Sequence, residues 1–129
     1  MAVWFENHSE HIALPHVEKL ADLDDEWGLL NLGCRYSAGK SVERREDKAI
    51  FFFKRVYDKD KGYAGIAAHN IGKSYLEADS PKAKIWFMNA ATKGFAPAMY
   101  NYGIALIEGW DGIFDTVEGN SWVSRAAKQ

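Results

Sequence analysis

Small and large apolar residues recur at helical spacing through most of the chain. The stretch from Lys82 to Gly103, KAKIWFMNAATKGFAPAMYNYG, places small residues at 83, 90, 91, 96 and 98 and contains glycines at 94 and 103. Offsets of 3, 7 and 8 residues from Ala83 fall on one face of a helix, because an α-helix has about 3.6 residues per turn. This stretch therefore predicts one helix that ends near Gly94 and a second that begins directly after it, with Pro97 in its first turn.

A triplet of Asn, an apolar residue and Gly occurs three times, with its glycine at Gly33, Gly72 and Gly103. The helical pattern with offsets of 3, 7 and 8 begins 16, 11 and 16 residues beyond these glycines. The glycines themselves lie 39 and then 31 residues apart. Because an insertion in a surface loop costs little free energy, we attribute the unequal period to connectors of different length.

The recurrent glycines predict close helix packing. A glycine inside a helix costs about 1 kcal/mol relative to alanine, so its return at one place in three copies indicates that close backbone contact offsets the cost. Small residues such as Ala83 and Ala90 belong to the opposing helices. We expect Phe52, Trp86 and Trp122 to fill the volume beside the glycines.

These patterns together predict an all-α solenoid of about three helix-turn-helix repeats, approximately 27–65, 66–96 and 97–129. A leading helix precedes the repeats and opens with Pro15 in its first turn. Its Leu20 and Ala21 precede Gly33 by the same offsets that link small residues of one repeat to the glycine of the next. We therefore expect seven helices, an N-terminal segment over residues 1–14 and a single helical-repeat domain over 15–129.

The pattern is most complete in residues 67 to 98. There Ile71-Gly72-x-x-Tyr75 is followed by Lys82-Ala83-x-x-Trp86-x-x-x-Ala90-Ala91-x-x-Gly94-x-Ala96. This arrangement resembles the Sel1-like repeat (SLR), a relative of the tetratricopeptide repeat, and the resemblance extends over roughly residues 16 to 129. It implies a right-handed superhelical stack whose concave face is lined by the first helix of each pair, and a protein that holds other proteins.

The same resemblance places candidate partner-binding residues on the concave face. They are Asn31, His69, Asn70, Lys73, Tyr100 and Asn101. The three asparagines form a ladder, and an amide can both donate to and accept from an extended peptide backbone. The alternative is that asparagine is simply common at this position of the repeat.

Two long connectors, residues 37–47 and 108–118, are further candidates for specificity. The second carries Trp110, Ile113 and Phe114 among acidic residues. Apolar loop residues commonly mark a contact, so Trp110 and Phe114 are added to the candidate partner-binding residues, although they could instead tuck under the stack.

Aromatic residues are adjacent in sequence at 51–53 and at 86–87. The rings of 51–53 and of 86–87 cannot all face inward, because successive helix residues point about 100 degrees apart. We expect one ring of each set to pack on the neighbouring repeat, with an exposed anchor as the alternative.

Charge and composition exclude several classes of function. The 16 basic and 18 acidic residues are interleaved, which argues against a nucleic-acid binder, since such proteins need a clustered positive surface. No apolar run approaches the ~18 residues of a membrane span, and the N-terminus lacks the features of a secretory signal. We expect no membrane association, and a cytoplasmic location.

Catalytic and metal-binding chemistry is not expected, and no cofactor is predicted. Cys34 is the single cysteine and, with His69, is the nearest approach to a nucleophile and base, so an enzyme would require these side chains to converge. His8 and His11 could meet a metal ion if their segment were helical. However, no carboxylate or cysteine spacing completes a recognised metal site.

The predicted function is a non-catalytic protein-binding module. Its most concrete version is an immunity protein that neutralises a cognate bacterial toxin. The alternatives are a general adaptor or scaffold in signalling or assembly, and a self-associating structural unit. A homodimer would follow if a second copy covered the end of the stack, which carries no polar capping helix before Gln129.

Overall fold

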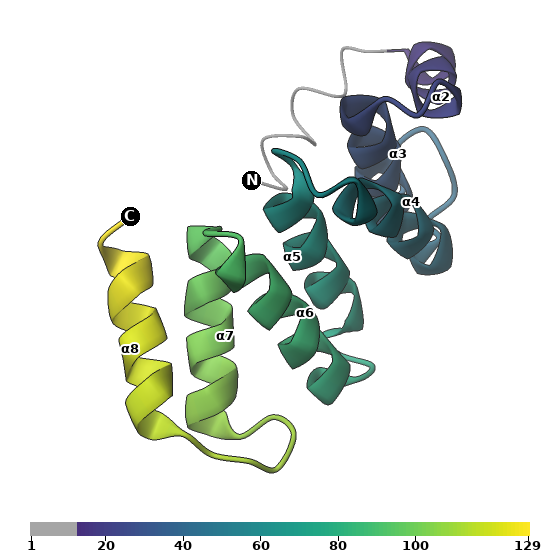
Figure 1. Cartoon of the computed structure of the whole chain (residues 1–129). Helices are drawn as coiled ribbons and strands as arrows, with labels where there is room; N and C mark the ends of the chain where they lie inside the picture. Colours follow the sequence, from purple (N-terminus) through teal and green to yellow (C-terminus); the bar gives the residue numbers. More distant parts are fainter. Residues whose placement is uncertain (1–12) are drawn as a thin grey trace.

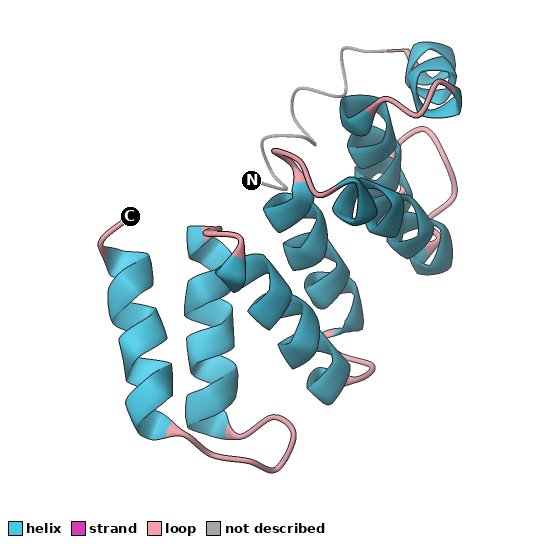
Figure 2. Cartoon of the chain, in the orientation of Figure 1, coloured by secondary structure: helices cyan, strands magenta, loops and turns pink. Residues whose placement is uncertain are grey.

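The computed structural model describes residues 13–129, which form seven helices and contain no strand. The helices are α2 (Leu14–Asp22), α3 (Glu26–Ala38), α4 (Glu46–Lys59), α5 (Ala64–Tyr75), α6 (Ser80–Thr92), α7 (Ala96–Glu108) and α8 (Thr116–Ala127). Each helix packs chiefly on the helices before and after it, and the stack runs from α2 at one end to α8 at the other (Figures 1 and 2). The structure is the all-α solenoid that the periodicity predicts.

Local sequence sets the beginnings of most helices. The carboxylates of Asp25, Asp79 and Asp115 each accept a hydrogen bond, at 2.9 to 3.1 Å, from the backbone N–H three residues later. These contacts satisfy N–H groups that have no partner within the helix. Pro15 and Pro97 lie in the first turns of α2 and α7, as predicted.

The glycines of the first two repeats lie against phenylalanine rings. A Cβ atom built on Gly33 would lie 2.6 Å from Cε1 of Phe53, and one built on Gly72 would lie 2.7 Å from Cε1 of Phe87. Both rings are fully buried. The predicted close approach between paired helices is therefore confirmed at these two positions.

In the third repeat, the two helix backbones approach one another directly. A Cβ atom on Gly103 would lie 2.7 Å from the backbone oxygen of Gly119 and 2.7 Å from Cγ2 of Val123. Gly119 occupies the repeat position of Ala83, so the small residue expected opposite the glycine is present. Glycine at both positions lets α7 and α8 pack without an intervening side chain.

Phe52, Trp86 and Trp122, expected beside the glycines, are not the residues that touch them. The residue that follows each of them makes the glycine contact, because one step along a helix turns the side chain by about 100 degrees. Trp86 instead packs edge-to-face on Tyr57 of α4, with ring centroids 5.2 Å apart. This contact confirms that one ring of the pair at 86–87 packs on the neighbouring repeat.

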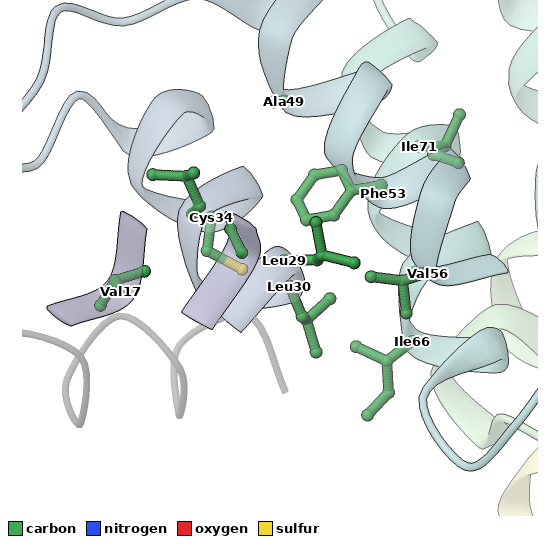
Figure 3. Packing of buried hydrophobic residues seen from close by; sticks show 12 residues of the cluster. Val17, Leu29, Leu30, Cys34, Ala49, Phe53, Val56, Ile66 and Ile71 are labelled. Carbon is green, nitrogen blue, oxygen red and sulfur yellow. The ribbon is translucent and has the colours of Figure 1, made fainter. Parts of the chain in front are cut away.

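The core continues from one helix pair to the next. Val17, Leu29, Phe53 and Ile71 come from α2, α3, α4 and α5 and are almost completely buried in one cluster. Figure 3 shows the ring of Phe53 among the aliphatic side chains of this cluster. Burial of each such side chain contributes about 1.5 to 3 kcal/mol, so this interior holds the first repeats together.

Candidate protein-binding surface

Polar side chains link the first helices of successive pairs. Nδ2 of Asn70 on α5 lies 3.9 Å from Sγ of Cys34 on α3. Nδ2 of Asn101 on α7 lies 3.1 Å from Nε2 of His69 on α5. The asparagine ladder expected from the sequence therefore includes two bridges between repeats, which position α3, α5 and α7 relative to one another.

Asn31, the first residue of this ladder, lies in the interior. Its side chain is fully buried, and its Oδ1 accepts a hydrogen bond of 2.9 Å from Nε of Arg35 one turn later. Burial of Arg35 lowers the pKa of its guanidinium from the ordinary value. Asn31 and the nearly buried Asn70 thus support the helix layer from within, whereas Asn101 is partly exposed.

His69 is nearly buried between aromatic rings. Its ring centroid lies 5.4 Å from that of Phe87 and 5.1 Å from that of Phe95. Burial and then the nearby charge of Lys73 lower the pKa of His69 to about 4, so the imidazole is neutral at pH 7. Nε2 of His69 lies within hydrogen-bond distance of Asn101, whereas Nδ1 is buried without a hydrogen-bond partner among the described residues.

Cys34 and His69 each contact an asparagine on the first helix of the next pair. The buried thiol of Cys34 faces the amide of Asn70, and Nε2 of His69 lies 3.1 Å from the amide of Asn101. Both residues hold neighbouring helices together.

A polar pocket of 260 Å³ lies where the C-terminal ends of α3 and α5 meet the connector of residues 37–47. It is lined by Ser37, Arg44, Glu46, Lys73, Ser74, Leu76 and Glu77. Oγ of Ser74 and Oε2 of Glu46 are buried without a hydrogen-bond partner among the described residues. The structure thereby brings Lys73 and the first long connector together, beside polar atoms that a bound peptide could satisfy.

Trp110 of the second long connector packs against the stack. Its ring lies edge-to-face with Phe87, with centroids 6.1 Å apart, and its Nε1 donates a hydrogen bond of 2.8 Å to Oε1 of Glu108. Trp110 is therefore partly buried against the stack.

The residues that follow Trp110 form an exposed apolar patch. Ile113, Phe114 and Val117, which we call the connector patch, are 65%, 68% and 82% exposed. The sequence did not single out Val117, because an apolar residue in the first turn of a helix resembles a core position. Large apolar side chains grouped in this way on a surface are typical of a contact with another molecule.

The backbone beneath the connector patch is held by specific contacts. Nζ of Lys84 on α6 lies 2.8 Å from Oδ2 of Asp111, and Oδ1 of Asp111 accepts a hydrogen bond of 3.1 Å from the N–H of Ile113. Gly109 ends α7 with a φ of +66°, and the ring of Phe114 lies directly against it. The patch is therefore fixed in place before any partner binds.

Tyr100, on α7, is the remaining exposed candidate. It is 51% exposed, and Lys73 on α5 is exposed as well. Together with the partly exposed Asn101, these residues are the accessible part of the predicted groove.

The described residues contain no further chemical centre of the kinds considered. Within 13–129, no group of three His, Cys, Asp or Glu residues is placed to hold a metal ion. No helix in this range has both the length and the apolar character needed to cross a membrane. His8 and His11 lie outside the described residues.

Comparison with known proteins identifies the repeat. No protein-family model matches the chain. The chain is similar to the crystal structure of a Sel1 repeat protein from Oxalobacter formigenes, with 26% identity, a TM-score of 0.72 and coverage of 90% of this chain and 89% of that one. It is also similar to a protective antigen of uropathogenic Escherichia coli with an SLR fold, at 27% identity and a TM-score of 0.82. The chain therefore has the SLR fold.

Two of the similar proteins are much longer than this chain. The chain covers 26% of the Escherichia coli antigen, and that match spans 92% of the present chain. It is also 30% identical over 86 residues to chitin synthase regulatory factor 3 of Schizosaccharomyces pombe, which covers 64% of this chain and only 9% of the yeast protein. The similarity to the two longer proteins is therefore confined to a part of each.

Proposed function

We propose that this SLR protein is a non-catalytic protein-binding module whose partner docks on the connector patch and along the first helices. The single observation that carries the proposal is the connector patch itself, in which three large apolar side chains are exposed on a backbone held by Lys84, Asp111 and Gly109. A preformed patch loses little conformational entropy on binding, which favours affinity. The SLR fold, which is typical of protein-interaction modules, supports the same conclusion.

The accessible groove residues extend this surface. Lys73 supplies a cation beside the polar pocket, and Tyr100 offers a large amphipathic ring, a residue type enriched in protein interfaces. Asn101 is half-buried because it also contacts His69. We propose that the partner meets these three side chains and the connector patch, with Asn31 and Asn70 acting only as internal supports.

The test begins with capture of partners by the tagged protein from its native organism, followed by reconstitution of the binding with the purified partner. The Ile113→Ser/Phe114→Ser double variant is expected to weaken the dissociation constant by at least about tenfold, since central apolar anchors dominate interface energies. Leu23→Ser is the matched control, because Leu23 is 69% exposed at the turn between α2 and α3. Equal loss in the control, or unchanged affinity in the double variant, would remove the connector patch from the proposal.

A narrower version of the proposal is an immunity protein that neutralises a cognate toxin. It is supported by the slight negative charge of −2 and by the connector patch, which suits one dedicated partner. Co-expression with a toxin encoded in the neighbouring locus is expected to protect cells, and the Ile113→Ser/Phe114→Ser variant is expected to lose that protection. A locus without a toxin gene would count against this version.

A second candidate is an adaptor or scaffold. It is favoured by the similarity to a yeast protein named as a regulatory factor, although this chain spans only 9% of that protein. An adaptor would capture several partners at once, whereas an immunity protein would form a complex with one. A self-associating unit would instead show a mass that rises with its own concentration in sedimentation experiments.

A further inference from the structure

A second pocket lies between the leading helix α2 and the first helix pair, α3 and α4. It has a volume of 370 Å³, and we call it the first-seam pocket. Its lining includes Glu18, Ala21 and Asp22 of α2, Tyr36 of α3, and Phe52 and Arg55 of α4. None of these side chains belongs to the surface proposed above.

The repeat supplies an internal comparison for this pocket. Between α4, α5 and α6, the equivalent positions hold Lys54, Tyr57, Tyr75 and Trp86. The ring of Trp86 packs edge-to-face on Tyr57, and Nζ of Lys54 lies 5.8 Å from the centroid of Trp86. Two large rings and one cation thus meet between α4, α5 and α6, which we call the second seam.

The first seam carries smaller and oppositely charged residues at these positions. Ala21 stands at the position of Tyr57, Phe52 at that of Trp86, and Glu18 at that of Lys54. The pocket is lined by Ala21 and Phe52, the residues equivalent to Tyr57 and Trp86. Relative to the second seam, the first lacks one large ring and has a carboxylate, that of Glu18, at the position of the Lys54 ammonium.

The floor of the first-seam pocket is aromatic. The rings of Phe52 and Tyr36 are nearly parallel, with centroids 5.9 Å apart and an interplanar angle of 11°. In the later repeats, the residue equivalent to Phe52 has a cation over its face: Lys54 lies over Trp86, and Arg125 lies 4.2 Å from the centroid of Trp122. No cation of the described residues lies over Phe52.

Arg55, the basic residue that lines the pocket, is engaged elsewhere. Its guanidinium pairs with Asp24 at 2.8 Å and lies over the ring of Phe51, 5.8 Å from the centroid. Glu18 and Asp22 stand one turn apart on the same face of α2 and are exposed. Within residues 13–129, no basic side chain forms an ion pair with either carboxylate, so the rim of the pocket is negative.

We propose that the first-seam pocket binds an arginine side chain of a partner protein, with its guanidinium over Phe52 and against the carboxylates of Glu18 and Asp22. A guanidinium suits this pocket, because it is planar, stacks on aromatic faces and pairs with carboxylates through two parallel hydrogen bonds. The ammonium group of a lysine side chain has the charge but is not planar, and it would fill less of the pocket. The inference depends on the proposed function only in that the arginine belongs to a protein.

The test uses the full chain and needs no identified partner. Acetyl-arginine amide is titrated while the backbone amide resonances are followed by NMR. Saturable shifts are expected in α2, the C-terminal half of α3 and α4. The neutral isostere acetyl-citrulline amide is expected to bind at least about tenfold more weakly, because it lacks the charge. Absence of saturable shifts with the arginine probe, or equal shifts with citrulline, would overturn the proposal.

Variants locate the binding in the pocket. Ala21→Tyr restores the tyrosine of the second seam and is expected to weaken binding of the arginine probe by at least about tenfold. Glu18→Gln and Asp22→Asn preserve shape, and each is expected to weaken binding several-fold. Asp58→Asn is the matched control, since Asp58 is the exposed equivalent of Asp22 in the filled seam. Equal effects of Asp22→Asn and Asp58→Asn would contradict the assignment.

Other occupants give different results. If residues 1–12 fill the pocket, their deletion will shift the same resonances in the absence of probe, and the proposal fails. If a second copy fills it, those shifts will depend on protein concentration, which also contradicts it. Failure of the arginine test leaves the proposed function standing, because that function is tested separately through Ile113 and Phe114.

Discussion

The second and third repeats place a glycine at the same position and use it differently. Gly72 lies against the buried ring of Phe87, whereas Gly103 lies against the backbone of Gly119. In the second repeat, a large side chain fills the space that the glycine leaves. In the third repeat, two glycines let the helices meet directly, so the same sequence signal marks two kinds of packing.

The difference determines which neighbour would have to move if a side chain were added. An aromatic ring can tilt or be replaced by a smaller side chain. A backbone oxygen in a helix can move only if the whole helix moves, because it is held by the helix hydrogen bonds. The third repeat should therefore tolerate substitution of its glycine less well than the second.

The largest effect is expected for Gly103→Ala. The new Cβ atom would lie 2.7 Å from the oxygen of Gly119, which forces α7 and α8 apart. We expect a loss of about 3 to 4 kcal/mol in the free energy of unfolding, even after alanine's gain of about 1 kcal/mol in helix propensity. The difference in unfolding free energy between the variant and the parent is measured by chemical denaturation.

The control for this prediction is the addition of Val123→Ala. This change removes the Cγ2 atom that also crowds Gly103 but leaves the oxygen of Gly119 in place. We expect the double variant to regain little of the stability that Gly103→Ala loses. Full recovery would show that a side chain, rather than the backbone, limits the approach.

A pH-dependent effect is expected next, and it belongs to the second repeat. His69 contacts Phe87, and its pKa of about 4 in the folded state is below the ordinary value of 6.5. Between these values, the unfolded state binds more protons, so this contribution is present above pH 6.5 and is lost as the pH falls. The loss at pH 4 is up to about 3 kcal/mol.

The measurement compares the parent with His69→Gln. Their difference in unfolding free energy is expected to change between pH 7 and pH 4, because only the parent contains the titrating imidazole. A constant difference across this range would mean that His69 keeps its ordinary pKa in the folded protein.

An intermediate effect is expected for Gly72→Ala. Its Cβ atom would meet the ring of Phe87 at 2.7 Å, and we expect a loss of about 2 kcal/mol because the ring can shift only partly within a packed core. Adding Phe87→Leu should recover about 1 kcal/mol relative to the sum of the single changes. Strict additivity in this double-mutant cycle would contradict the proposed contact.

The smallest effect is expected where the second and third repeats meet. The hydrogen bond from Lys84, followed by that from the N–H of Ile113, lowers the pKa of Asp111. Lys84→Met is expected to raise the pKa of Asp111 toward its ordinary value, as measured by NMR titration of the carboxyl group. Lys82→Met is the control, since Lys82 lies over the ring of Tyr75 instead. An unchanged pKa in Lys84→Met would remove this ion pair from the support of the connector patch.

Several site predictions depended on local pattern alone, and their outcomes differ for physical reasons. Asn70 and Asn101 do form contacts between repeats, but a repeated position cannot reveal whether an amide faces a groove or a neighbouring helix. His69 is buried because Phe87 and Phe95 close over it, and both are distant in sequence. Trp110 and Phe114 stand four residues apart, yet only the first ring is covered by the stack.

The sequence by itself determined the all-α class, the seven helices and the positions of close approach, because helical periodicity and recurrent glycines are local properties of the chain. The tertiary structure alone decided which ring meets each glycine, which polar groups are buried and where pockets remain. Those outcomes depend on the rotation of each helix about its own axis. That rotation is set by side chains from other repeats. Tyr57, for example, packs on the ring of Trp86, whereas the small Ala21 leaves a pocket beside the ring of Phe52.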